Sequence, residues 1–153
     1  MGAMKCLIIA SAILVICVGN ALPQSPNKSV EVYEAVVRYQ IKSFRVDTYC
    51  IKIGEKDADK DFLRRLNPLP VKGASDCIEQ TRNNLPPMNV LDKHTKRSAV
   101  IFDLGKIGWR SDTEADVDGG YLCASQCRAG GIYHVFWDGT RWVIRDFEIR
   151  VQS

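Results

Sequence analysis

The last third of the chain alternates hydrophobic and polar residues from Ala115 to Val151. Because the side chains of a β-strand point alternately to the two faces of a sheet, this pattern predicts two or three antiparallel strands. Asp138-Gly139 lies between two alternating runs and predicts a two-residue hairpin turn. With that turn, the pairs on the core face are Trp137 with Thr140, Val135 with Trp142, and Tyr133 with Ile144.

The opposite face of this hairpin is mixed, which suits a cavity, a second layer or partial contact with solvent. It carries Ile132, His134, Phe136, Arg141, Val143 and Arg145. After Arg145 the apolar positions change parity and fall on Phe147, Ile149 and Val151. One extra residue in a strand re-aims all the side chains that follow it, so we expect a β-bulge near Asp146.

A helical pattern precedes these strands. Between Ser29 and Phe44 the apolar residues recur with a period of 3.6 and form the stripe Val30, Tyr33, Val37, Ile41 and Phe44. Ser29 is placed to cap this amphipathic helix. The helix needs an apolar surface to pack on, and the C-terminal sheet supplies one.

Two further elements follow the helix. Thr48 to Ile53 alternates β-branched and aromatic residues and predicts a strand that ends at Gly54. A short helix around Phe62 is then indicated by acidic residues before it and by Arg64 and Arg65 at its end, the charge order that the helix dipole favours.

The segment from Asn67 to Arg97 is rich in proline, asparagine and charge, which predicts a long loop with at most a turn of helix near Ser75. A strand resumes at Ala99 to Leu104, extends to Trp109, and is followed by the strand that contains Gly119-Gly120. Two glycines inside a strand indicate a bulge or a close backbone approach. The element order predicts an α+β fold, with an amphipathic N-terminal helix and a short second helix packed on a curved antiparallel sheet.

The N-terminus has the features of a secretory signal peptide. Lys5 precedes an apolar run from Cys6 to Val18, and Gly19-Asn20-Ala21 offers small residues for cleavage. The run is too short to favour a membrane-spanning helix. We expect a signal peptide over 1–21, a flexible lead-in over 22–28 and one domain over 29–153. Acylation at Cys17 is the alternative, but Ile16 is bulkier than lipoprotein processing accepts.

Charge argues against nucleic acid as a partner. The chain has 21 Lys and Arg and 18 Asp and Glu residues, and loss of Lys5 with the signal peptide leaves a net charge of +2. That value is not the basic footprint of a nucleic-acid-binding protein. Contact with a membrane is expected only through the signal segment before its cleavage.

Four cysteines remain after removal of the signal peptide: Cys50, Cys77, Cys123 and Cys127. An even number in an exported chain predicts two disulfides and a secreted or periplasmic location. Three pairings are open, and the spacing favours Cys50 with Cys77 and Cys123 with Cys127. A redox pair normally has two intervening residues, not three, and a structural zinc site normally has two close cysteine pairs, not one. We therefore expect no metal and no cofactor.

Part of the sequence resembles a group of uncharacterised bacterial secreted proteins. The likeness covers about half of the mature chain and rests on Ser75-Asp76-Cys77, Gly119-Gly120-Tyr121, Cys123 and Cys127, Gly130-Gly131-Ile132-Tyr133-His134-Val135, Asp138-Gly139 and Trp142-Val143. It implies bacterial export, and the group brings no activity with it. Two helical segments ahead of strands that end in a Gly-x-x-Trp-hydrophobic hairpin also resemble the cone-shaped NTF2-like fold.

The chemistry of the chain is sparse, because the common nucleophile, phosphate-loop and zinc-protease motifs are missing. His134 is the candidate catalytic residue, as a general base with Asp116, Asp118 or Tyr121 nearby, should its face line a cavity. The alternative is a structural histidine on the sheet. The candidate binding residues are Trp109, Tyr121, His134 and Phe136.

We therefore expect an exported, non-enzymatic module that binds a protein or a small apolar ligand through the sheet face or the Asn67 to Arg97 segment. An NTF2-like hydrolase or isomerase centred on His134 is the alternative. A thiol-disulfide protein using Cys123 and Cys127 is a third hypothesis.

Overall fold

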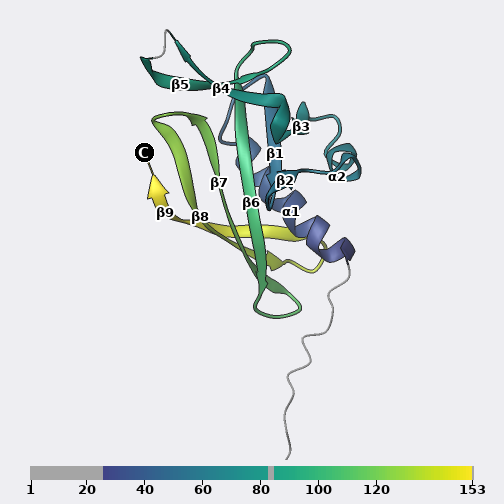
Figure 1. Ribbon diagram of the computed structural model, residues 1–153. Helices are drawn as coiled ribbons and strands as arrows, with labels where there is room; N and C mark the ends of the chain where they lie inside the picture. Colours follow the sequence, from purple (N-terminus) through teal and green to yellow (C-terminus); the bar gives the residue numbers. More distant parts are fainter. Residues whose placement is uncertain (1–25, 83–84, 153) are drawn as a thin grey trace, which may run out of the picture.

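The computed structural model describes residues 26–82 and 85–152. In chain order the elements are α1 (Pro26–Ile41), β1 (Thr48–Ile53), β2 (Lys56–Asp57), α2 (Lys60–Arg65), β3 (Val71–Gly73), a 3-10 turn (Ala74–Asp76), β4 (Cys77–Arg82), β5 (Leu85–Asp92), β6 (Ala99–Trp109), β7 (Glu114–Ala124), β8 (Cys127–Trp137) and β9 (Trp142–Gln152) (Figure 1). The predicted α+β class is confirmed. The expected signal peptide lies outside the described residues.

The long strands form an antiparallel meander in the order β6, β7, β8, β9. β1 joins this meander as a parallel neighbour of β6, and β3 runs parallel to β1. The sheet is therefore mixed, and the prediction of a wholly antiparallel sheet was wrong. A parallel neighbour needs a long crossover, which here runs through α2, β3 and the β4–β5 hairpin.

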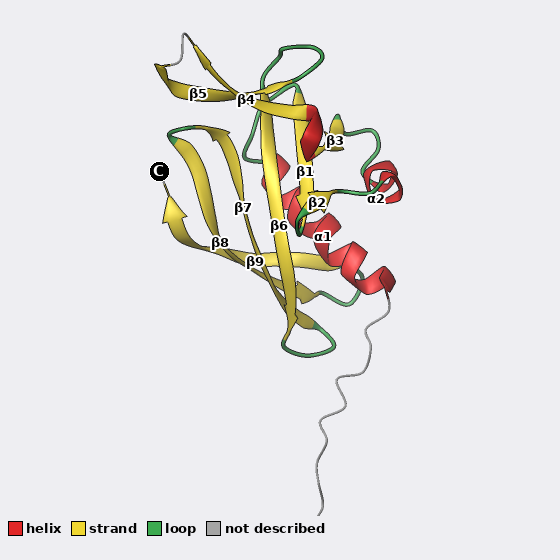
Figure 2. Cartoon of the chain, in the orientation of Figure 1, coloured by secondary structure: helices red, strands yellow, loops and turns green. Residues whose placement is uncertain are grey.

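The segment from Asn67 to Arg97 is not the long loop that its composition predicts. It contains β3, the 3-10 turn and the β4–β5 hairpin, which projects from one end of the sheet (Figure 2). Pro86 and Pro87 fall where the β4–β5 ladder shifts register next to Arg82, so the missing N–H groups break no regular pairing. β5 meets β7 through the single pair Asn89 and Ala124.

The β8–β9 hairpin has a longer turn than predicted. Trp137 pairs with Trp142, so four residues, 138–141, form the connection. The Asp138 side chain organises it by accepting hydrogen bonds from the backbone N–H groups of Thr140 and Arg141, each at 2.9 Å. The true register differs from the predicted one by two residues, so the paired residues keep their predicted faces, whereas Thr140 and Arg141 lie in the turn.

Two irregularities bend β9. Val135 pairs with Ile144 and His134 with Asp146, so Arg145 is an extra residue, as the parity change in the sequence predicted. A second register shift makes Arg150 an extra residue between the pairs Gly131–Ile149 and Gly130–Val151.

The main core lies between α1 and the concave face of the sheet, here called the inner face; the other side is the outer face. α1 packs against β6, β8 and β9. The fully buried side chains of the inner face include Val100, Phe102 and Leu104 of β6, together with Val117 and Tyr133.

The buried stripe of α1 is rotated relative to the prediction. Val32, Val36 and Val37 have no exposed surface, whereas Val30 and Tyr33 are only partly buried. α1 also begins at Pro26, so Ser29 lies inside the helix and does not cap it. The curved sheet covers more of the helix surface than a flat sheet would. The polar side chain of Gln40 is therefore buried as well.

Two pairs of glycines face each other across β7 and β8. Gly119 pairs with Gly131, and Gly120 with Gly130, across β7 and β8. A Cβ added at Gly120 would lie 2.0 Å from the carbonyl oxygen of Ala129. The predicted close backbone approach at Gly119-Gly120 is therefore confirmed.

Both favoured disulfides are present. Cys50–Cys77 joins β1 to the start of β4, with 6.2 Å between the Cα atoms, and Cys123–Cys127 closes the β7–β8 turn, with 5.3 Å. The first bridge lies in a small second core on the outer face, beneath the β4–β5 hairpin. Its other members are Val90, Ala99, Ile101 and Leu122.

Candidate functional site

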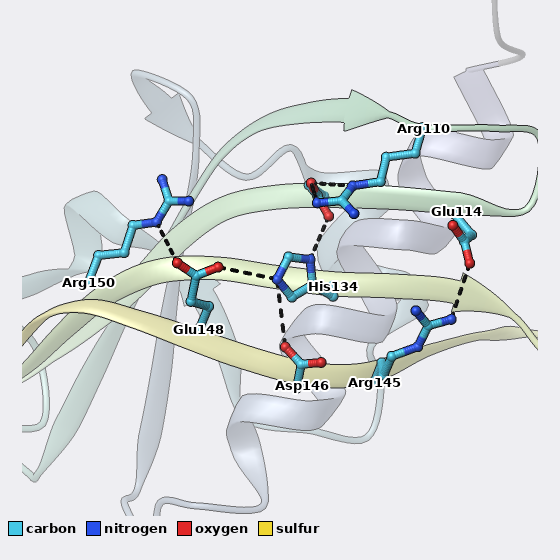
Figure 3. Close-up of polar contacts among 8 residues, drawn as sticks. Arg110, Glu114, His134, Arg145, Asp146, Glu148 and Arg150 are labelled. Atoms are coloured by element: carbon cyan, nitrogen blue, oxygen red, sulfur yellow. Dashed lines mark hydrogen bonds and ion pairs between the residues drawn. The ribbon is translucent and has the colours of Figure 1, made fainter.

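His134 lies on β8 and points to the outer face, away from α1. Its Nδ1 atom is 2.7 Å from Oδ1 of Asp116 on β7 (Figure 3). Its Nε2 atom is 3.5 Å from a Glu148 oxygen and 3.7 Å from an Asp146 oxygen, both on β9. Three carboxylates therefore surround the imidazole ring.

Two of the three carboxylates around His134, those of Asp116 and Glu148, are themselves paired with arginines. Arg110 binds Asp116 through Nε at 2.7 Å and Nη2 at 2.6 Å. Burial alone would raise the pKa of Asp116, but hydrogen bonds from His134 and Arg110 outweigh it and hold that pKa below its usual range. A hydrogen bond from Arg150 likewise lowers the pKa of Glu148.

This arrangement is a poor general base. A catalytic imidazole needs one nitrogen facing the substrate, whereas both nitrogens of His134 face carboxylates. The adjacent cavity holds about 170 Å³, below the 300–1,000 Å³ typical of small-molecule sites. The geometry favours a cross-strand tie between β7, β8 and β9.

The other candidate binding residues do not converge on His134. Phe136 shares the outer face, where the Arg145 guanidinium lies 5.1 Å from its ring. Trp109 packs on the inner face against Trp142, with 5.7 Å between ring centroids. Tyr121 turns its ring to Phe44, 4.7 Å away, also on the inner side.

A different feature of the outer face has the size of a binding site. A cavity of about 880 Å³, here called the outer-face trough, runs across β6, β7 and β8 between the β4–β5 hairpin and the end of β9. Glycines make up much of its bed: Gly105, Gly119, Gly120 and Gly130. Its apolar residues are Ile101, Leu122, Ala129 and Val151. Of the predicted binding residues, Tyr121 alone borders it.

Some of the charged side chains that line the trough have ionic or hydrogen-bonding partners, and others do not. Lys52 lies 3.4 Å from Asp103, and Arg128 also has a partner. Glu79 on β4 and Asp118 on β7 are exposed and have no hydrogen-bonding or ionic partner within residues 26–82 and 85–152. The hydroxyl oxygen of Ser125 is buried beside the trough and also lacks a partner in the described part of the chain.

The sequence does not predict the trough, because the lining comes from seven elements, β1, the 3-10 turn, β4, β6, β7, β8 and β9, and spacing along the chain does not reveal their proximity. One signal was present. The glycine pairs at 119–120 and 130–131 marked the strands where backbone is uncovered, and they indicated a close approach without showing a site.

No protein-family model, curated protein or solved structure matches this chain. Within the described ranges, no helix has the length and apolar character needed to cross a membrane. The same ranges hold no group of three His, Cys, Asp or Glu side chains arranged to hold a metal ion. The two disulfides indicate an oxidising environment outside the cytoplasm.

Proposed function

We propose that this chain is an exported, disulfide-stabilised binding module without catalytic activity, and that it holds its ligand in the outer-face trough. The trough carries this proposal because it combines the volume of a binding site with partly exposed apolar side chains on a sheet. Val151, which is 61% exposed, adds apolar surface to the trough.

The location of the trough supports the same conclusion. The sequence favoured binding through the sheet face or through the Asn67 to Arg97 segment, and the trough uses both. Ala74 and Glu79 of that segment form one wall, and β6 to β8 form the bed. The Cys50–Cys77 bridge fixes the wall to the sheet. The resemblance of about half of the mature chain to a group of uncharacterised bacterial secreted proteins supports export.

Gly130→Val tests the proposal by filling the trough without disturbing the fold. An added Cβ at Gly130 meets nothing closer than the Gly119 carbonyl oxygen at 4.0 Å. The matched control is Gly108→Val, since Gly108 also lies in a long strand, has a nearest contact at 3.9 Å and does not border the trough. Short peptides would be selected from a random display library on the wild-type protein and then measured on both variants.

We expect the selected peptides to lose binding to Gly130→Val and to keep it with Gly108→Val. Thermal unfolding of both variants checks that the fold is intact. A selection that yields no binder, or binders that tolerate Gly130→Val, would contradict a binding role for the trough.

A further inference from the structure

We infer that the ligand of the outer-face trough is an extended protein segment that carries lysine or arginine side chains. This inference rests on the proposed function and names the partner of the same site.

The charge of the trough selects for cations. Three carboxylates reach it from three strands: Glu79 on β4, Asp103 on β6 and Asp118 on β7. Two cations also line the trough: Lys52 lies 3.4 Å from Asp103, and Arg128 has a partner of its own, whereas Glu79 and Asp118 form no ion pair in the described part of the chain. Carboxylates therefore outnumber cations in the trough by three to two, which favours a cationic ligand over an anionic one.

The position of Asp118 brings this charge over the glycine bed. A Cβ added at Gly105 would lie 3.0 Å from the Cβ of Asp118, so the Asp118 side chain stands directly beside the bare backbone of β6. A ligand that lies on the bed therefore passes within reach of this carboxylate.

The apolar surface of the trough matches the rest of a basic side chain. Ile101 and Leu122 are partly buried, and Val151 is exposed. Lysine and arginine lay their aliphatic stems on apolar surface while the charged head reaches a polar rim. A stem on Leu122 or Val151 with its head at a carboxylate uses both features of the trough.

The open shape favours a chain segment over a small molecule. Small-molecule sites bury most of the ligand surface, whereas the trough is open along the sheet. A bed of glycines also lets the main chain of a partner approach the strands closely. An extended segment can gain contacts along the whole trough, which a small amine cannot.

The test uses the full chain and three short peptides of equal length. The first alternates lysine with valine, the second replaces lysine with acetyl-lysine, and the third replaces it with glutamate. Affinities are measured by fluorescence anisotropy, with 1,5-diaminopentane as a competitor that represents a small amine. The variant is Glu79→Gln/Asp118→Asn, and its charge-matched control is Glu31→Gln/Asp61→Asn, outside the trough.

We expect only the lysine peptide to bind, with affinity that falls as salt rises and drops about fivefold or more in Glu79→Gln/Asp118→Asn but not in the control. Gly130→Val should abolish it. Equal binding of the acetyl-lysine peptide would overturn the inference and leave the trough as an apolar site. Full displacement by diaminopentane at low concentration would overturn it in favour of a small amine. No binding by any of the three peptides, while library peptides bind at Gly130, would show that the charge argument is wrong and the trough proposal right.

Discussion

At the scale of single residues, Asp92 shows how hydrogen bonds offset the desolvation cost of a buried carboxylate. Its carboxylate has no exposed surface and accepts hydrogen bonds from Lys72 at 2.5 Å, Thr48 at 3.1 Å and the backbone N–H groups of His94 and Thr95. These partners join the end of β5 to β1 and β3. The sequence alone predicts a loop at residue 92, because two of the partners of Asp92 lie 20 and 44 residues away along the chain.

Acid should remove this stabilisation. The hydrogen bond from Lys72 is the largest cause that holds the pKa of Asp92 well below its ordinary value. A group whose pKa is lower in the folded state stabilises the fold above its unfolded pKa, about 4, and loses that effect as pH falls toward the folded value. We therefore expect Asp92→Asn to lower the unfolding temperature at pH 7 and to differ much less from wild type near pH 2. Asp112→Asn, with its carboxylate 85% exposed, serves as the control.

Gln40 and Tyr133 form a second buried polar contact, between α1 and β8. The Gln40 amide nitrogen donates to the Tyr133 hydroxyl at 2.5 Å, and burial raises the pKa of Tyr133 well above its ordinary value. Tyr133→Phe should cost about 1 to 3 kcal/mol in urea unfolding, because it leaves the buried Gln40 amide with only the Gly120 carbonyl oxygen at 3.5 Å as acceptor. Tyr133→Phe/Gln40→Met should recover part of that loss. A double variant less stable than Tyr133→Phe alone would show that the contact with Gly120 outweighs the lost hydrogen bond to Tyr133.

At the scale of elements, local periodicity is enough to predict a strand or helix whose apolar and polar residues alternate regularly along its own sequence. Alternation or charge order alone predicted the six residues of β1, the short α2, the strand β6 and the faces of β8. The β4–β5 hairpin was missed because its sequence is rich in proline and polar residues. It is held by the Cys50–Cys77 disulfide, by the hydrogen bonds of Asp92 and by the small second core, none of which leaves a periodic pattern in its sequence.

The glycines of the β7–β8 pair give a prediction at this scale. Gly120→Ala should destabilise the protein by about 3 kcal/mol or more, because its Cβ would collide with backbone at 2.0 Å. Gly130→Ala should change stability by less than about 0.5 kcal/mol, since its Cβ has room. Chemical denaturation of both variants measures the difference. Equal effects would mean that the strands can separate at Gly120 without loss.

At the scale of the whole molecule, the fold joins two layers that differ in what holds them. α1 is held to the inner face by apolar packing, whereas the β4–β5 hairpin is held to the outer face by Cys50–Cys77 and a small second core. The pairing of the cysteines could be predicted because spacing limits it. The binding trough could not, because it exists only once the hairpin folds over the sheet.

Removal of the two disulfides should therefore have unequal effects. In the chain-entropy model, loss of Cys50–Cys77, with a sequence separation of 27, costs about 3.5 kcal/mol, and loss of Cys123–Cys127, with a separation of 4, costs about 2 kcal/mol. Paired Cys→Ala variants test this by urea unfolding. Hydrogen exchange should show faster exchange in β4 and β5 only for the Cys50→Ala/Cys77→Ala variant. Uniformly faster exchange in that variant would mean that the hairpin does not open separately from the sheet.

The two bulges of β9 affect the tendency of the protein to aggregate at high concentration. β9 pairs with β8 on one side and is the edge of the sheet on the other, where a free strand could recruit the strand of another chain. Arg145 and Arg150 interrupt that edge, so only Asp146 to Ile149 remains regular between them. A run that short, with two carboxylates in it, is a poor template for fibril growth.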